Sequence, residues 1–168
     1  MRTISIKAGL PADLEAVVAV ENRCFAAYRR SSRRALLCSL KSPTQQVWIA
    51  WSREPGQPPV AAGVLIMHRR RFSLRIYSLA VLPTYRGCGV GRRLVSKVLA
   101  EARRQPQVRY VALEADRRDR RLVRWYEGMG FVAEWRLPDY YAPGRDGVRM
   151  CRYVTRRTHR KETLMQYT

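Results

Sequence analysis

The chain has 168 residues, 46% of them hydrophobic, and 33 Lys+Arg against 13 Asp+Glu give it a formal net charge of +20. The length suits one domain, the apolar share excludes a disordered chain, and the charge indicates an anionic partner. That partner is a nucleic acid, a membrane surface, a phosphorylated cofactor or an acidic peptide. Only four of the cations are lysines, so an arginine-rich composition of GC-rich genomes accounts for the excess about equally well.

The hydrophobic pattern predicts a strand, two helices, three strands, a helix, a strand, a helix and two final strands. The expected strands are residues 2–7, 46–51, 60–68, 72–81, 108–114, 131–137 and 148–154, and residues 138–147 are expected to form the last loop. Antiparallel strands followed by strand–helix–strand units predict an α/β fold with a mixed central sheet of about seven strands flanked by about four helices. We expect one domain over residues 1–154 and a basic, flexible tail over 155–168.

The expected helices show amphipathic spacing. The first begins around Pro11 and buries Leu14, Val17 and Val18. The others cover residues 33–41, 89–104 and 119–128, and the third has five apolar residues on one face: Leu94, Val95, Val98, Leu99 and Ala102.

The sequence shows no pattern typical of a metal site, an export signal or a membrane-spanning helix. The four cysteines form no Cys-x-x-Cys pair, so we expect no metal site. The first residues lack the apolar core of an export signal. No uncharged run approaches the roughly 18 residues that a spanning helix needs. We therefore predict a cytoplasmic protein with no membrane partner, and the sequence leaves monomer and dimer open.

The most informative stretch is residues 77–94, YSLAVLPTYRGCGVGRRL, in which a strand is followed by glycines where a helix begins. Glycines let backbone N–H groups approach an anion, and the helix N-terminus and nearby arginines add positive charge. The spacing Gly-x-Gly-x-Gly fits neither the dinucleotide fingerprint nor the Walker motif. The pattern predicts a phosphate cradle, and the alternative is a glycine-rich turn without a ligand.

Three blocks of sequence resemble the GNAT acetyltransferase superfamily. Residues 86–91, RGCGVG, resemble its pyrophosphate loop. Residues 113–131, LEADRRDRRLVRWYEGMGF, and residues 139–150, DYYAPGRDGVRM, resemble two blocks of its ribosomal-protein alanine N-acetyltransferase (RimI-like) branch, the second with slightly shorter spacing. The expected element order also fits the GNAT fold from about residue 3 to residue 154. The resemblance implies acetyl-CoA as the acetyl donor and direct transfer to an amine.

The resemblance also implies which residues bind acetyl-CoA. The glycine loop would hold the diphosphate, and the strand before it would bind pantetheine through backbone groups and polarise the thioester carbonyl with an N–H near Val81. The implied cofactor-binding residues are Leu79, Ala80, Val81, Arg86, Gly87, Cys88, Gly89, Val90, Gly91, Arg92 and Asp119. Two positions depart from the family pattern: Asp119 replaces an asparagine and Leu122 replaces a small alanine. Asp119 can still cap a helix, and Leu122 would narrow the pantetheine channel.

Tyr126 and Glu114 are the implied catalytic residues. The resemblance makes Tyr126 the acid that protonates the leaving thiolate, although its spacing from Leu122 and Met129 equally fits a core tyrosine. Glu114 ends an apolar strand, and a carboxylate in such surroundings is a stronger base than a solvated one. The alternative for Glu114 is a strand-end carboxylate paired with an arginine.

The acceptor would lie among aromatic side chains, since rings with polar tips suit a peptide N-terminus held in a groove. The implied substrate-binding residues are Phe25, Tyr28, Tyr140 and Tyr141. The expected acceptor is the N-terminal α-amine of a protein, with a ribosomal protein as the example that the resemblance suggests. The alternatives are a lysine side chain, a small amine, or a non-catalytic module that binds CoA or RNA. Both halves of the chain carry a similar excess of cations, so a nucleic acid is not expected as a specific partner.

Overall fold

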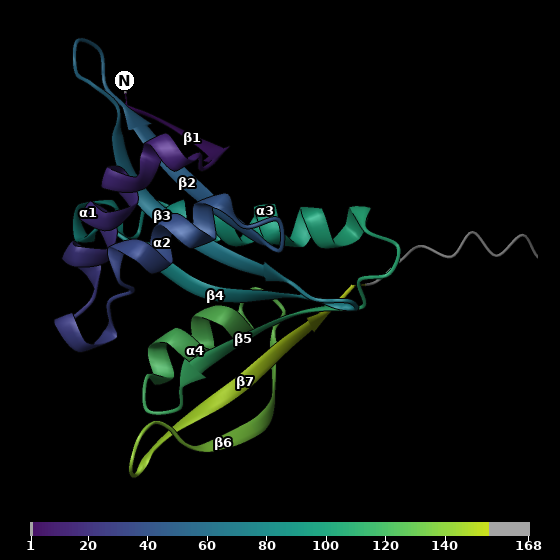
Figure 1. Ribbon diagram of the computed structural model, residues 1–168. Coiled ribbons are helices and arrows are strands. Elements are labelled where there is room, and N and C mark those ends of the chain that lie inside the picture. The colour runs from purple at the N-terminus through teal and green to yellow at the C-terminus, as the bar shows by residue number, and fades with distance from the viewer. Residues whose placement is uncertain (1, 155–168) are drawn as a thin grey trace, which may run out of the picture.

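The computed structural model describes residues 2–154, and the expected tail over 155–168 lies outside the described residues. Seven strands and four α-helices follow one another in the predicted order (Figure 1). The strands are β1 (Thr3–Ala8), β2 (Gln45–Arg53), β3 (Val60–Arg69), β4 (Ser73–Val81), β5 (Tyr110–Asp116), β6 (Val132–Ala142) and β7 (Arg145–Tyr153). The helices are α1 (Leu14–Cys24), α2 (Arg33–Lys41), α3 (Val90–Arg104) and α4 (Arg120–Glu127). No helix in the described part of the chain is long and apolar enough to cross a membrane.

All seven strands form one sheet in the order β1-β2-β3-β4-β5-β7-β6. Neighbouring strands are antiparallel except β4 and β5, which are parallel and are joined through α3. The mixed α/β sheet predicted from the sequence is therefore confirmed. The parallel pair, β4 and β5, lies near the centre of the sheet. Parallel neighbours need a crossover connection, and α3 is part of that connection.

Two hydrophobic cores cover the two faces of the sheet. Alternate residues of β3 point to opposite faces, so Leu65 and Met67 join the core under α3 while Val64 and Ile66 join the core under α1 and α2. All five apolar residues predicted on the face of α3 are buried. In α1 the buried residues are Leu14, Val17, Val20 and Glu21, and Val18, which was expected in this stripe, is only half-buried.

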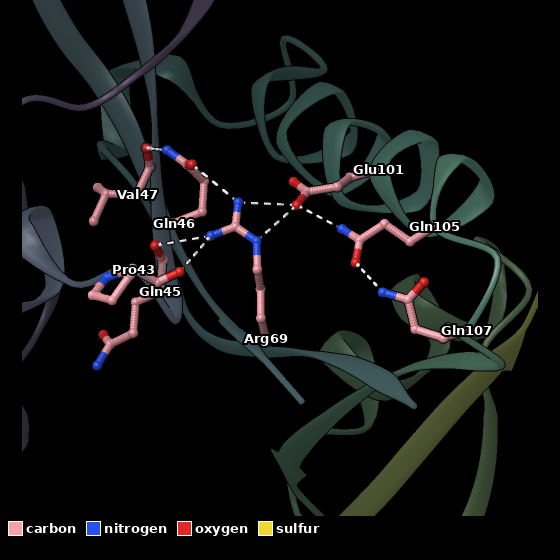
Figure 2. Close-up of polar contacts among 8 residues, drawn as sticks. All are labelled: Pro43, Gln45, Gln46, Val47, Arg69, Glu101, Gln105 and Gln107. Carbon is pink, nitrogen blue, oxygen red and sulfur yellow. Dashed lines mark hydrogen bonds and ion pairs between the residues drawn. The ribbon is translucent and has the colours of Figure 1, made fainter. Parts of the chain in front are cut away.

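A polar network fixes the end of β3. The guanidinium of Arg69 donates to the carbonyl oxygens of Pro43 and Gln45, to the side chain of Gln46 and to Glu101 of α3 (Figure 2). One side chain thus joins β3, β2 and the helix beneath them.

The last two strands are longer than the pattern predicts. Residues 138–147 were expected to be a loop, but β6 extends to Ala142 and β7 begins at Arg145, so Pro143 and Gly144 alone connect them. Gly144 has a φ of 70° and Asp139 a φ of 52°, and the register shifts between Leu137 and Ala142. Prolines and glycines within the segment hid the pairing, because a bulged edge strand tolerates them.

Candidate active site

A cleft lies where β4 and β5 separate. Their ladder runs from Ser73↔Tyr110 to Ile76↔Leu113 and goes no further, and the two ribbons diverge beyond it (Figure 1). The register between β3 and β4 shifts at the same level, leaving Tyr77 without a partner opposite it. A bulge of this kind bends a strand away from its neighbour. The cleft has a volume of about 860 Å³ and is lined by β4 on one side and by the end of β5 on the other.

The glycine turn lies between β4 and α3. Gly87 and Gly89 have φ values of 76° and 77°, a region that favours glycine, and Gly89 is the N-cap of α3. A Cβ atom at Gly91 would meet the ring of Trp125 at 3.3 Å, so a larger residue here would push that ring aside by a few tenths of an ångström. Arg86 donates from Nε to the carbonyl oxygen of Val81 at 3.1 Å, which fastens the turn to the end of β4.

Three of the residues expected to bind a cofactor line the cleft directly: Leu79, Arg86 and Asp119. The others occupy the end of β4 and the glycine turn: Ala80, Val81, Gly87, Cys88, Gly89, Val90, Gly91 and Arg92. Asp119 caps α4, accepting a hydrogen bond from the backbone N–H of Leu122 at 2.9 Å. With Arg121 also on the cleft wall, the donor set of backbone N–H groups, a helix N-terminus and arginines suits the phosphates of CoA.

Tyr126 projects from α4 into both the core and the cleft. Its side chain is buried, with its ring edge-on to Trp125 at 4.8 Å and to Phe131 at 5.6 Å between centroids. It also lines the cleft. Burial, and to a smaller extent Tyr141, raises the pKa of Tyr126 above its usual value of 10.0. The hydroxyl therefore stays protonated at neutral pH and is available as a proton donor.

Glu114 lies on the cleft wall between two arginines. Its side chain is 4% exposed, and Arg75 and Arg149 each reach one of its carboxylate oxygens at 2.8 Å. Arg75 also donates to the hydroxyl of Tyr140 at 3.0 Å. The arginine-paired alternative from the sequence is therefore what the geometry shows, although the side chain is buried rather than exposed. These two partners could not be identified from the pattern of residues, because Arg75 and Arg149 come from strands on either side of β5.

The aromatic residues expected to bind the acceptor gather mainly at one end of the cleft. Phe25, Tyr140 and Tyr141 line it, and the rings of Tyr140 and Tyr141 meet edge-on at 5.0 Å. Arg29 lies over the ring of Tyr141 at 5.5 Å, so the segment after α1 contacts the β6–β7 hairpin. Tyr28 is 80% exposed and lies outside the cleft wall.

One cleft residue escaped the sequence analysis. Glu21 of α1 lines the cleft yet is only 2% exposed. The helical spacing could have predicted its burial, because Glu21 lies seven residues after Leu14 and four after Val17, on the buried face of the helix. A carboxylate in such a stripe needs a polar partner or a function.

Comparison with known proteins finds a family and a relative that this chain resembles. The model of the acetyltransferase (GNAT) family matches residues 14–131. The chain is 27% identical over 125 residues to N-alpha-acetyltransferase 30 of Saccharomyces cerevisiae, an alignment that covers 71% of this chain and 70% of the yeast protein.

Two solved structures have a similar fold. The ribosomal-protein-S18-alanine N-acetyltransferase of Escherichia coli aligns with a TM-score of 0.80 and 19% identity, covering 99% of this chain and 100% of that chain. Arabidopsis thaliana NAA60 in complex with acetyl-CoA aligns with a TM-score of 0.78 and 20% identity, covering 90% of this chain and 99% of that chain.

Proposed function

The chain belongs to the acetyltransferase (GNAT) family, and from this premise we propose that it transfers the acetyl group of acetyl-CoA to the N-terminal α-amine of a protein. The observation that carries the proposal is the cleft between β4 and β5, which has a turn with the positive-φ residues Gly87 and Gly89 beside it and the side chains of Phe25, Tyr140 and Tyr141 on its wall. The yeast relative's name, N-alpha-acetyltransferase 30, supports an α-amine as the acceptor.

The donor side follows from the glycine turn. In the proposal, backbone N–H groups at Gly87 and Gly89 and the N-terminus of α3 bind the diphosphate of acetyl-CoA, and Arg86 and Arg121 add charge from the cleft wall. The edge of β4 that faces β5 is free of ladder pairing beyond Ile76. Its backbone groups at Leu79 to Val81 are therefore available to pantetheine and to the thioester carbonyl.

Proton transfer needs an acid for the thiolate and a base for the amine. Tyr126 supplies the acid, because its protonated hydroxyl lies on the cleft wall. Two glutamates, Glu114 and Glu21, line the same cleft and are the candidates for taking the amine proton. Glu114 is held by two arginines, whereas Glu21 accepts hydrogen bonds from two neutral groups.

The acceptor side is a short aromatic groove. In the proposal, Phe25 and Tyr141 hold the first residue of the acceptor, and Tyr140, fixed by Arg75, closes the groove from the hairpin. Tyr28 would contact a longer peptide at the rim. A ribosomal protein as the acceptor and the cytoplasm as the location belong to the same proposal.

The test compares peptides that differ only at their amines. Thiol release from acetyl-CoA is measured with a library of N-terminal peptides, with the same peptides blocked at the α-amine but carrying a free lysine, and with small amines. We expect turnover with free α-amines alone, and mass spectrometry should place the acetyl group on the first residue. Acetylation confined to lysine side chains or to small amines would refute the α-amine proposal.

A further inference from the structure

Glu21 occupies the junction between the donor strand and the acceptor segment. Its Oε1 accepts a hydrogen bond from Ser78 Oγ of β4 at 3.3 Å, and its Oε2 accepts one from the backbone N–H of Ser31 at 3.3 Å. Ser78 directly precedes Leu79, the start of the strand segment proposed to bind pantetheine. Ser31 follows the segment that carries Phe25. The carboxylate therefore lies where the two substrates must meet.

The hydrogen-bond partners of Glu21 differ in kind from those of Glu114 and Asp116. Glu114 is held by Arg75 and Arg149, and Asp116 by Arg145. Glu21 accepts hydrogen bonds from two neutral donors, the Ser78 hydroxyl and the backbone N–H of Ser31. Each carboxylate oxygen of Glu114 already faces a guanidinium, so an approaching amine would have to compete with a full positive charge there. Burial raises the pKa of Glu21, an effect that its two hydrogen bonds only partly offset.

We propose that Glu21 is the general base that removes the proton from the acceptor amine. The inference rests on the proposed acetyl transfer. As the amine nitrogen bonds to the thioester carbonyl carbon, one N–H proton passes to a carboxylate oxygen of Glu21. When the C–S bond breaks, the sulfur takes the hydroxyl proton of Tyr126. The proton on Glu21 then returns to the Tyr126 oxygen through water in the cleft, so that both side chains regain their starting forms.

The other charged and titratable groups around Glu21 do not duplicate this role. They are Cys24 on its own helix, Arg29 after it, Arg75 and Tyr77 on β4, Arg86 in the glycine turn, Tyr126 on α4 and Tyr141 on β6. Burial raises the pKa of the Cys24 thiol and of the Tyr126 hydroxyl, and it raises the pKa of Tyr141 to about 12. The Cys24 thiol and the two tyrosine hydroxyls therefore remain protonated at neutral pH. The cleft also holds Arg121, Arg145 and Tyr140, together with Asp116, which is held by Arg145, and Asp119, which caps α4. Glu21 and Glu114 are therefore the carboxylates that the test must distinguish.

The test replaces each carboxylate by its amide, using the amine acceptor that supports turnover. We expect E21Q to lower kcat by about 100-fold at neutral pH, the lower end of the range for general base catalysis. The loss should shrink as pH rises, because hydroxide takes over the proton. The KM for the acceptor and the Kd for acetyl-CoA should change by less than about threefold. Glu101, which pairs with Arg69 (Figure 2) and is not among the residues that line the cleft, supplies the matched control, and E101Q should keep normal kcat.

Two results would overturn the proposal. If E21Q keeps the pH profile of kcat and changes only KM, Glu21 merely positions the acceptor segment. If E114Q rather than E21Q flattens the pH profile, Glu114 is the base. S78A separates the two roles further, because it removes one hydrogen bond and keeps the carboxylate. An NMR titration of the Glu21 carboxyl needs no acceptor, so it tests Glu21 even if α-amine peptides fail as substrates. A titration midpoint below 4.5, the ordinary pKa of a glutamate, would also refute the proposal.

Discussion

Replacing Tyr126 with phenylalanine removes one hydroxyl from the cleft wall and leaves the ring in place. The ring carries the packing, through its edge-on contacts with Trp125 and Phe131. Y126F should therefore change the free energy of unfolding by less than about 1 kcal/mol, as expected for a volume-conserving substitution. Y126A would remove the ring as well and should cost about 3–5 kcal/mol, the usual range for a buried aromatic residue.

The same Y126F substitution should affect kcat much more than it affects stability. Loss of a general acid lowers rates by about 10²–10⁴-fold, and 10²-fold corresponds to about 2.7 kcal/mol of transition-state free energy. We thus expect Y126F to lose at least 100-fold in kcat while binding acetyl-CoA normally. The magnitude is tied to the structure by the burial of the hydroxyl, which keeps it protonated and limits replacement by solvent.

The assay is thiol release under saturating acetyl-CoA, with calorimetry for binding and thermal unfolding for stability. Y126A serves as the comparison, since it should lose both activity and Tm. The reasoning about Tyr126 is refuted if Y126F turns over at the rate of the parent enzyme. In that case the tyrosine is a core residue only, as its spacing on α4 also allows.

Two further changes probe the glycine turn at Gly89 and the buried carboxylate of Asp116. G89E puts a side chain on a backbone with a φ of 77° and a negative charge at the N-terminus of α3, so calorimetry should detect no binding of acetyl-CoA; normal affinity would mean that the phosphates bind elsewhere. Burial would raise the pKa of Asp116, but the Arg118 N–H and the Arg145 guanidinium outweigh it and lower the pKa. The resulting stability is present above the unfolded pKa near 3.9 and is lost as pH falls through the lower folded value. Urea unfolding between about pH 5 and pH 2 should therefore show a weaker pH dependence in D116N, and an unchanged dependence would assign the effect to other carboxylates.

Local sequence signals predicted most of the secondary structure. Residues 33–41 were predicted as a helix and form α2. The glycine turn was recognised because backbone with positive φ favours glycine and because the amphipathic pattern of α3 begins directly after it. The last hairpin was predicted too short, since its pairing depends on contact across two strands. The stripe of α1 was misjudged at Val18 because a helix of 3.6 residues per turn allows either neighbour to face the core.

The sequence alone determined the order of elements, the glycine turn and the family resemblance, because each depends on residues close together in the chain. Only the tertiary structure decided which groups surround Glu114 and Glu21 in the cleft. Glu114 receives its arginines from β4 and β7 through the register of the sheet. Glu21 accepts a hydrogen bond from Ser78, 57 positions away in the chain, and another from the backbone N–H of Ser31, and both donors are neutral. The basicity of a carboxylate depends on such neighbours and on its access to water, and neither can be read from spacing along the chain.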